Sequence, residues 1–234
     1  MRKIGLIGGT LWHSTVVYYR LINELTAGKI GSQANPEMII YSLNIELMRE
    51  QNRDKINNAY LDISRKLKTA GAEAIIICAN TPHMVFSFVQ PQIDIPILHI
   101  ADAVGRAAGK KGLKILGLLG NRPTMTGDFI SGYLKENYGI ETIIPEEEYL
   151  DRSHNFVSAE LTRGIFSDEA RSFFLEQMKL LKDRGAEGII LGCTELPMLI
   201  EEKSFDLPLF ATTNLHAQMA VEFILEENLI EKNK

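Results

Sequence analysis

The feature that most constrains the fold of this chain is an internal repeat. Two stretches at an offset of 114 residues read alike, LKTAGAEAIIICANT at Leu67–Thr81 and LKDRGAEGIILGCTE at Leu181–Glu195. Two shorter pairs follow in the same order at an offset of 112, GLIGG (Gly5–Gly9) with GLLGN (Gly117–Asn121), and IDIPI (Ile93–Ile97) with FDLPL (Phe205–Leu209). Two unrelated domains with similar strand ends could give any one of these pairs. Three pairs in one order favour a duplicated half-molecule.

Short apolar runs alternate with longer amphipathic segments along the chain. Six runs are typical of buried strands: Lys3–Gly8, Met38–Ser42, Ala74–Cys78, Lys114–Leu119, Glu141–Ile144 and Gly188–Leu191. Six segments have helical spacing: Ser14–Thr26, Arg53–Ala70, Ala101–Lys110, Thr126–Asn137, Ser167–Arg184 and Leu215–Glu226. Strand followed by helix, repeated, predicts an α/β fold of two similar, doubly wound parallel-sheet domains.

The repeat offset also predicts the domain boundaries. Residues 1–100 together with 211–234 are expected to form the first half, and residues 101–210 the second. The last segment has no counterpart in the repeat, so we expect it to form a helix that packs back on the first half. Because open α/β sheets bind ligands at the carboxyl ends of their strands, we expect the active site in the cleft between the halves.

Composition excludes several classes of function. The chain has 234 residues and a net charge of −5, so nucleic acid is not an expected partner. No apolar run approaches the ~20 residues of a membrane span, and no secretion signal is present, so a cytoplasmic location is expected. In a reducing compartment the two cysteines, Cys78 and Cys193, are expected to be thiols. The five histidines are scattered without ligand spacing, so no metal is expected.

The strand ends that the repeat aligns carry the residues best suited to chemistry. Ala79–Thr81 and Cys193–Glu195 directly follow apolar runs, and the alignment pairs Ala79 with Cys193. Successive strand side chains point to opposite faces, so Cys78 should point away from the site if Cys193 points into it. Cys78 is then a small buried hydrophobe. Backbone N–H groups in the turn after Cys193 are expected to favour its thiolate.

Three motifs, GGTLWHSTVVYYRLIN, ICANTPH and LGCTELP, together with their spacing, resemble the aspartate/glutamate racemase family of cofactor-independent amino-acid racemases. The resemblance runs from Lys3 to about His216. It implies two similar α/β domains and a pair of cysteines that remove and return the Cα proton from opposite faces. Cys193 matches the family's cysteine in GCT. The family's habit also implies a homodimer that needs no cofactor.

The first-half base is where this sequence departs from the family. The base precedes Asn-Thr there, and this chain has Ala79 at that position. A threonine occurs there in a branch typified by a bacterial L-aspartate/glutamate-specific racemase, whose GGxxWxST start this chain also resembles. Alanine has no titratable group. Placing Cys78 at the base position would need a bulged strand end, against which the repeat argues.

Substrate-binding residues are expected at both strand ends and in two loops. Asn80, Thr81, Thr194 and Thr124 offer donors for the α-carboxylate, and Glu195 belongs to the same set. The resemblance places recognition of the distal carboxylate in the loop at Asn52, with Arg53 or its close competitor Arg49. A solvated charge is a nearly equal alternative for Arg53.

Two further features at the surface are open to simpler interpretations. The Gly8–Gly9 turn before Thr10 could hold a carboxylate at the start of a helix, but tight backbone packing is equally compatible with its glycines. The acidic run Glu146–Glu148 is interpreted as solvated charge only.

The sequence therefore predicts a racemase of an acidic amino acid, aspartate or glutamate, with Cys193 as the thiol acid/base. One alternative is a one-cysteine decarboxylase or isomerase of a dicarboxylate, because protonating one face needs one acid. Another is an inactive homologue that binds a dicarboxylate or an amino acid. The expected partner in each case is a small molecule.

Overall fold

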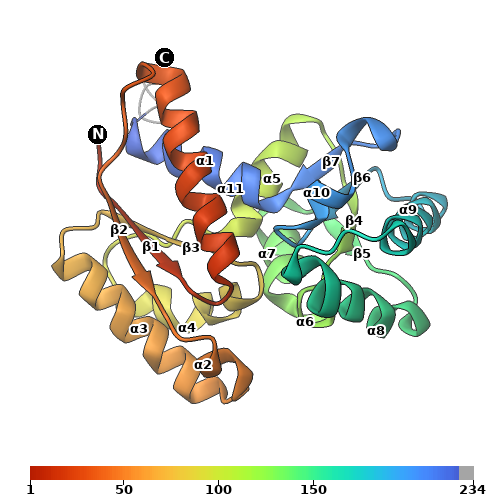
Figure 1. The fold of residues 1–234 in the computed structure, drawn as a ribbon, viewed down its shortest axis with the longest axis horizontal. Helices are drawn as coiled ribbons and strands as arrows, with labels where there is room; N and C mark the ends of the chain where they lie inside the picture. The colour runs from red at the N-terminus through yellow and green to blue at the C-terminus, as the bar shows by residue number, and fades with distance from the viewer. Residues whose placement is uncertain (227–234) are drawn as a thin grey trace. The chain divides into compact units, whose positions relative to one another are not determined.

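A computed structural model of the chain describes residues 1–226, so the predicted residues 227–234 lie outside the described part. The described chain forms two compact units (Figure 1). Unit 1 comprises Met1–His99 and the segment from His216 onward, and unit 2 comprises Ile100–Leu215. The chain re-enters unit 1 at His216, inside the last helix rather than at residue 211.

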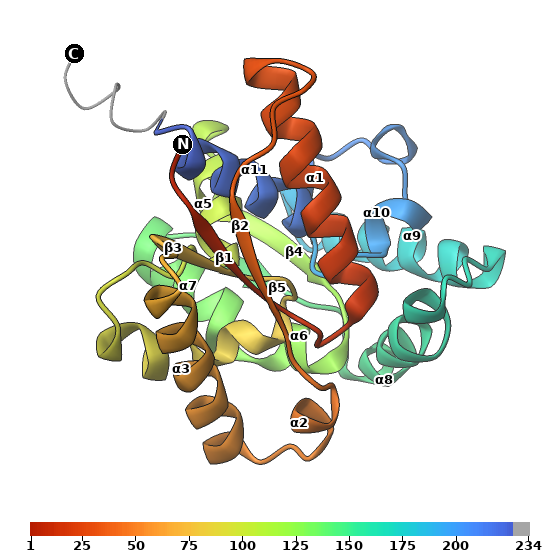
Figure 2. The same cartoon turned by 60° about the vertical axis from the view of Figure 1, so that its left-hand side comes forward.

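Unit 1 is built on a three-stranded parallel sheet of order β2-β1-β3. Its strands are β1 (Ile4–Gly8), β2 (Met38–Ser42) and β3 (Ala74–Ile77), and its helices are α1 (Trp12–Ile30), α2 (Glu46–Arg49), α3 (Arg53–Thr69), η1 (Thr81–Val85), α4 (Phe86–Val89) and η2 (Gln90–Gln92). Apolar side chains of α3 pack with Ile75 and Ile77 on one face, and those of α1 and α11 (Thr212–Ile224) pack with Ile76 on the other. Figure 2 shows the sheet between these helices.

Unit 2 repeats this plan with a four-stranded parallel sheet of order β5-β4-β6-β7. Its strands are β4 (Ile115–Leu119), β5 (Glu141–Ile143), β6 (Gly188–Leu191) and β7 (Leu209–Ala211). Its helices are α5 (Ile100–Lys110), α6 (Arg122–Thr126), α7 (Asp128–Tyr138), α8 (Glu147–Asn155), η3 (Phe156–Glu160), η4 (Leu161–Arg163), α9 (Asp168–Asp183), α10 (Leu196–Leu199) and η5 (Glu202–Ser204). Side chains of α9 cover one face of the sheet, and those of α5 and α7 cover the other.

The two units share details as well as topology. β3 and β6 are four-residue strands at the offset of the sequence repeat. An isolated parallel bridge between Ile75 and Ile97 in unit 1 corresponds to the start of the pairing between β6 and β7, which joins Ile189 to Leu209. A Cβ on Gly5 would meet Leu67 at 3.1 Å, and one on Gly117 would meet the equivalent Leu181 at 3.0 Å. The prediction of two similar parallel-sheet α/β domains is confirmed.

The acidic run Glu146–Glu148 is exposed to solvent at all three residues, as predicted. The run leads into α8, and its charges are used there. Glu146 pairs with Arg184 at 3.1 Å, and Glu147 pairs with Arg122. Glu147 and Glu148 lie in the first turn of α8, where carboxylates interact favourably with the N-terminal dipole of the helix.

Within residues 1–226, no helix combines the length and the apolar character needed to cross a bilayer.

Candidate functional site

Cys193 lies directly beyond the end of β6. The N–H of Gly192 donates to the carbonyl of Leu119 at 2.7 Å, and a Cβ on Gly192 would lie 2.8 Å from that oxygen. Only glycine allows this close approach of the two backbones. The following residue, Cys193, keeps the face of Ile189 and Leu191 and is 9% exposed. The strand thus delivers the thiol to the edge of the sheet with little solvent around it.

The Cys193 thiol donates a hydrogen bond from Sγ to Oε2 of Glu195 at 2.9 Å. Burial raises the pKa of Cys193 well above its usual range, and the Glu195 carboxylate raises it further. The backbone N–H groups of Glu195 and Leu196 lower this pKa, but their effect is smaller. The turn amides therefore favour the thiolate, as expected, but desolvation and the neighbouring carboxylate outweigh them, so Cys193 rests as a thiol.

Two threonines accompany this thiol in unit 2. Thr194 is buried at the same strand end, and Thr124 is fully buried in α6. Asn121 begins that helix as its N-cap and accepts the N–H of Thr124 at 2.9 Å. The Thr124 methyl carbon lies 3.0 Å from the Cβ position of Gly192, next to the catalytic candidate. The structure therefore brings together four of the predicted site residues: Thr124, Cys193, Thr194 and Glu195.

The equivalent strand end of unit 1 has no thiol in that position. Cys78 is 2% exposed and packs in the cluster that holds Ile76 and Tyr18. Its burial raises its pKa. Ala79 is half-buried at the position that corresponds to Cys193. The alternation of the strand therefore turns Cys78 toward α1 and α11.

Asn80 and Thr81 follow Ala79. Asn80 is buried, and its side-chain oxygen Oδ1 has no hydrogen-bond partner among the described residues. Its backbone carbonyl accepts the N–H of His83 at 3.0 Å, which starts the short helix η1 at Thr81. A buried acceptor without a partner costs free energy, and it can be satisfied by an N–H group from a ligand.

The Gly8–Gly9 turn favours tight packing over anion binding. The N–H of Gly9 donates to Oγ1 of Thr15 at 3.0 Å, so this amide is already used. Gly9 has φ of 88°, and a Cβ there would lie 2.1 Å from the carbonyl oxygen of Leu43. Thr10 hydrogen bonds Tyr60 through the two hydroxyl oxygens, 3.1 Å apart. The pairing of β1 with β3 puts Thr10 at the same sheet edge as Ala79.

The loop residues before α3 have contacts of their own. Asn52 is the N-cap of α3, and its Oδ1 accepts the N–H of Lys55 at 3.0 Å. Arg53 donates from Nη2 to the carbonyl of Met84 at 2.6 Å, which ties the start of α3 to η1. Arg49 pairs with Glu46 at 2.5 Å. Arg53 is thus anchored near the β3 strand end, and Arg49 is held by its own helix.

Sequence reasoning missed a buried histidine cluster in unit 1. His83 has ring centroids 4.7 Å from His99 and 5.4 Å from His216. His216 donates from Nε2 to the carbonyl of Leu98 at 2.7 Å, so its Nδ1 accepts the hydroxyl of Tyr18 at 2.8 Å. Burial, then the neighbouring histidines, lower the pKa of His83, and the same causes lower that of His99 to about 3. Residues so far apart in sequence gave no signal of this cluster.

Comparison with known proteins places the chain in a family. The profile of the Asp/Glu/Hydantoin racemase family matches residues 7–220. The chain is 22% identical over 227 residues to the broad specificity amino-acid racemase RacX of Bacillus subtilis, covering 95% of this chain and 98% of that protein.

Solved structures agree with this placement. A candidate Asp/Glu racemase from Yersinia pestis is 35% identical with a TM-score of 0.90, over 96% of this chain and 100% of that one. An aspartate racemase homologue, PH1733 from Pyrococcus horikoshii, is 34% identical with a TM-score of 0.86, over the same shares of 96% and 100%. With two α/β units of one plan and a thiol at a strand end, the chain belongs to the Asp/Glu/hydantoin racemase family of isomerases.

Proposed function

We propose that this protein racemises an acidic amino acid, aspartate or glutamate, with Cys193 as its only thiol acid/base and without a cofactor. The observation that carries the proposal is the hydrogen bond from the Cys193 thiol to Glu195 at 2.9 Å. A buried thiol with a raised pKa needs a proton acceptor before it can act as a base. Glu195 is such an acceptor, already in hydrogen-bond contact.

The proposed reaction moves two protons. Glu195 takes the Cys193 proton, and the thiolate then removes the Cα proton of the substrate as the C–H bond breaks and its electron pair stays on Cα. The substrate's ammonium group, brought near the thiol, favours the thiolate through its positive charge. Returning the proton from Cys193 regenerates the starting enantiomer. Inversion requires a proton from the opposite face.

We propose that residues following the strands, together with two loop residues, bind the substrate. Asn80 Oδ1, buried and unpartnered within the described chain, would accept a hydrogen bond from the ammonium group. Thr81, Thr124 and Thr194 would donate to the α-carboxylate, and Asn52 with Arg53 would hold the distal carboxylate. Arg53, at the start of α3, donates to the carbonyl of Met84. This contact keeps Arg53 near the end of β3 and supports its assignment over Arg49.

Because of Ala79, the proposed reaction has a thiol acid/base for one face of the substrate only. The repeat and the family resemblance assign the second base position to Ala79, which has no thiol, so water or a hydroxyl such as that of Thr81 would supply the second proton. Weak acids donate slowly to a carbanion compared with a positioned thiol. Exchange of the Cα hydrogen with solvent, with retention of configuration, should therefore be faster than inversion at Cα.

The test is a proton NMR time course of L-aspartate, D-aspartate, L-glutamate and D-glutamate in D2O with the purified protein. We expect one enantiomer of one amino acid to lose its Cα proton signal faster than its optical rotation falls. Fast, equal inversion from both enantiomers would contradict the one-thiol mechanism. No exchange with any of the four would contradict the proposed substrate class.

A second candidate is decarboxylation or isomerisation of a dicarboxylate, which the single thiol also favours, because protonating one face needs one acid. Incubation with malonate-type acids separates the two candidates. Release of CO2 together with no Cα exchange on aspartate or glutamate would replace the racemase by a decarboxylase.

We further propose a cytoplasmic homodimer. Both cysteines are free thiols, which suits a reducing compartment. On α1, Trp12, Val16 and Tyr19 form one stripe with exposed fractions of 62%, 54% and 50%. Apolar stripes of this kind often mark contacts between subunits. Light scattering of the protein and of Val16→Glu tests the dimer, which the substitution should dissociate.

A further inference from the structure

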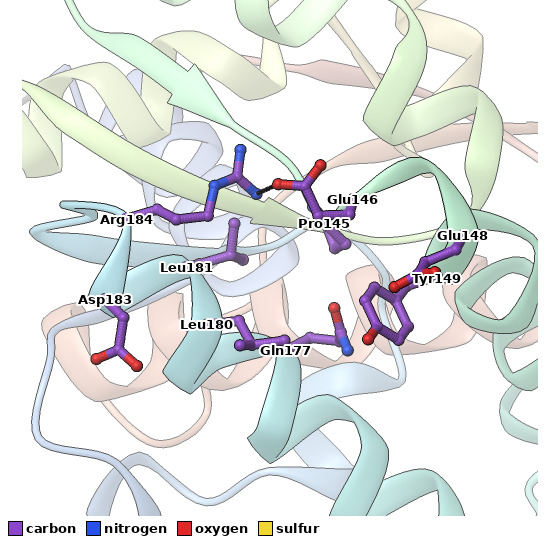
Figure 3. Close-up of a pocket in the computed structure, with 9 residues that line it drawn as sticks. All are labelled: Pro145, Glu146, Glu148, Tyr149, Gln177, Leu180, Leu181, Asp183 and Arg184. Atoms are coloured by element: carbon purple, nitrogen blue, oxygen red, sulfur yellow. Dashed lines mark ion pairs between the residues drawn. The ribbon is translucent and has the colours of Figure 1, made fainter.

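A surface pocket of unit 2 lies away from the residues assigned above. It has a volume of about 290 Å³ and lies between the segment that leads into α8 and the C-terminal half of α9 (Figure 3). Pro145 and Tyr149 line it on the α8 side, and Gln177 and Leu180 line it on the α9 side.

Gln177 is the unusual residue of this pocket. It is 0% exposed and lies on the buried face of α9, between Phe174 and Leu181, where an apolar side chain is expected. Neither its Oε1 nor its Nε2 has a hydrogen-bond partner among the described residues. Figure 3 shows the side chain extending toward Tyr149. A buried amide without partners destabilises the folded chain, so a glutamine at this position favours a ligand that satisfies its two polar groups.

The charges around the pocket select the ligand. Arg184 pairs through Nη1 with Glu146 at 3.1 Å and donates from the same nitrogen to the carbonyl of Ile144 at 2.7 Å, so Glu146 offsets its positive charge. Glu148 and Asp183 add two more carboxylates to the lining. The excess of negative charge disfavours anionic ligands, including the carboxylates that the proposed reaction consumes.

We propose that this pocket binds a small, uncharged molecule with a planar amide edge on an apolar or aromatic ring, such as a carboxamide or a lactam. The ligand's N–H would donate to Gln177 Oε1, and its carbonyl would accept from Nε2 in a two-bond pair. Leu180 and the Tyr149 ring would cover the apolar body. The half-buried Tyr149 forms the wall on the amide side, and its side chain must shift for the ligand to reach Gln177.

The test uses benzamide as the probe, with benzoate and N,N-dimethylbenzamide as controls. Benzoate has the same shape with a negative charge, and the dimethyl compound lacks the N–H donor. In 15N-edited NMR spectra, the side-chain NH2 signals of Gln177 are assigned by their loss in Gln177→Leu. We expect saturable shifts of these signals with benzamide. Either control should bind at least about tenfold more weakly, because benzoate is repelled by the carboxylates and N,N-dimethylbenzamide cannot donate a hydrogen bond.

Two variants complete the test. Gln177→Leu should abolish the preference for benzamide and raise Tm by about 2–4 °C, because it removes an unsatisfied amide. Lys179→Leu, a matched substitution at an exposed position of α9, should leave benzamide binding unchanged. Equal binding of all three probes to the wild-type protein, or no saturable shift of any signal at millimolar benzamide, would overturn the proposal even if Gln177→Leu failed to fold. Unchanged benzamide binding by folded Gln177→Leu would overturn it as well.

Discussion

The strand ends after β3 and β6 show how two copies of one fold can carry different chemistry. Both strands have four residues, both end at a sheet edge, and both are followed by a short helical segment. After β6 stand a thiol and a carboxylate in hydrogen-bond contact, Cys193 and Glu195. After β3 the equivalent positions hold Ala79 and Thr81. The shared backbone therefore sets the positions of these side chains. The residue types at those positions give unit 2, and not the equivalent strand end of unit 1, a thiol that can transfer its proton to a neighbouring carboxylate.

The two units also differ in the kind of ionisable group that each one buries. Unit 2 keeps a thiol whose pKa is raised by burial and by Glu195. Unit 1 keeps His83 and His99, whose pKa values are lowered by burial and by neighbouring histidines. In both units the uncharged form is favoured at neutral pH. In unit 2 the uncharged thiol of Cys193 has the Glu195 carboxylate within hydrogen-bond distance as a proton acceptor.

The largest effect should come from removing the thiol of unit 2. Cys193→Ser should reduce both Cα exchange and inversion by about a thousandfold, since a hydroxyl with a far higher pKa replaces the thiol as the base. The measurement is the NMR time course in D2O. Cys78→Ala is the matched control and should keep the activity, because Cys78 is 2% exposed within the apolar core. Loss of activity in the control alone would reverse the roles given to the two cysteines.

Removing the carboxylate should separate its two effects on Cys193. Glu195→Gln should lower turnover by about 10–100-fold, because the thiol loses its proton acceptor. The same change should speed alkylation of Cys193 by iodoacetamide, since the carboxylate raises the pKa of this thiol. Mass spectrometry of partly alkylated protein measures the second effect. A fall in both activity and alkylation would point to a structural role for Glu195.

Acid should destabilise unit 1 through its histidines. The native pKa of His99 is lowered to about 3 from the 6.5 of an ordinary histidine, so the unfolded chain binds more protons between these values. Stability is therefore complete above pH 6.5 and falls as the pH drops through this window. His99 alone should cost about 2 kcal/mol at pH 5.

Urea unfolding at pH 5 and pH 7 measures this difference, with His99→Phe as the variant that removes the titrating ring. Its difference between the two pH values should be smaller than that of the wild-type protein. His154, on α8 of unit 2, provides a control as His154→Phe. An unchanged pH dependence in His99→Phe would contradict the assignment.

The smallest effect should come from placing a second thiol at the strand end of unit 1. Ala79→Cys should raise inversion by about tenfold relative to exchange, because it supplies an acid on the second face. Ala79→Val adds bulk without an acid and should not raise inversion. Ala79 is half-buried, so the strand end can accept either side chain. The ratio of inversion to exchange in D2O is the measurement, and an unchanged ratio in Ala79→Cys would show that the second proton does not come from this position.

Much of the fold was predictable because it rests on local patterns. Gly71 and Gly185 follow amphipathic helices and adopt φ of 95° and 96°, which few other residues tolerate. The strands Met38–Ser42 and Gly188–Leu191 have the predicted bounds. The short strand β7 (Leu209–Ala211) was missed as a strand, since three residues carry too little periodicity to be distinguished from a loop.

The candidate site was predictable in its residues and not in its electrostatics. The repeat and the family motifs identify Cys193, Thr194 and Glu195 as neighbours at a strand end. They do not give the hydrogen bond between Sγ and Oε2, on which the direction of the pKa shift depends. Asn52 and Arg53 were likewise identified in the loop, but their capping and carbonyl contacts depend on the packed helix α3.

By itself the sequence determined the duplicated α/β plan and the thiol of the second half, because apolar periodicity and repeated motifs are properties of neighbouring residues. The tertiary structure alone decided that Cys193 rests as a thiol, that His83, His99 and His216 share a core, and that Gln177 is a buried amide without a partner. Burial and the approach of distant side chains set the cost of charge and of unpaired polar atoms, and these arise only when the chain is packed.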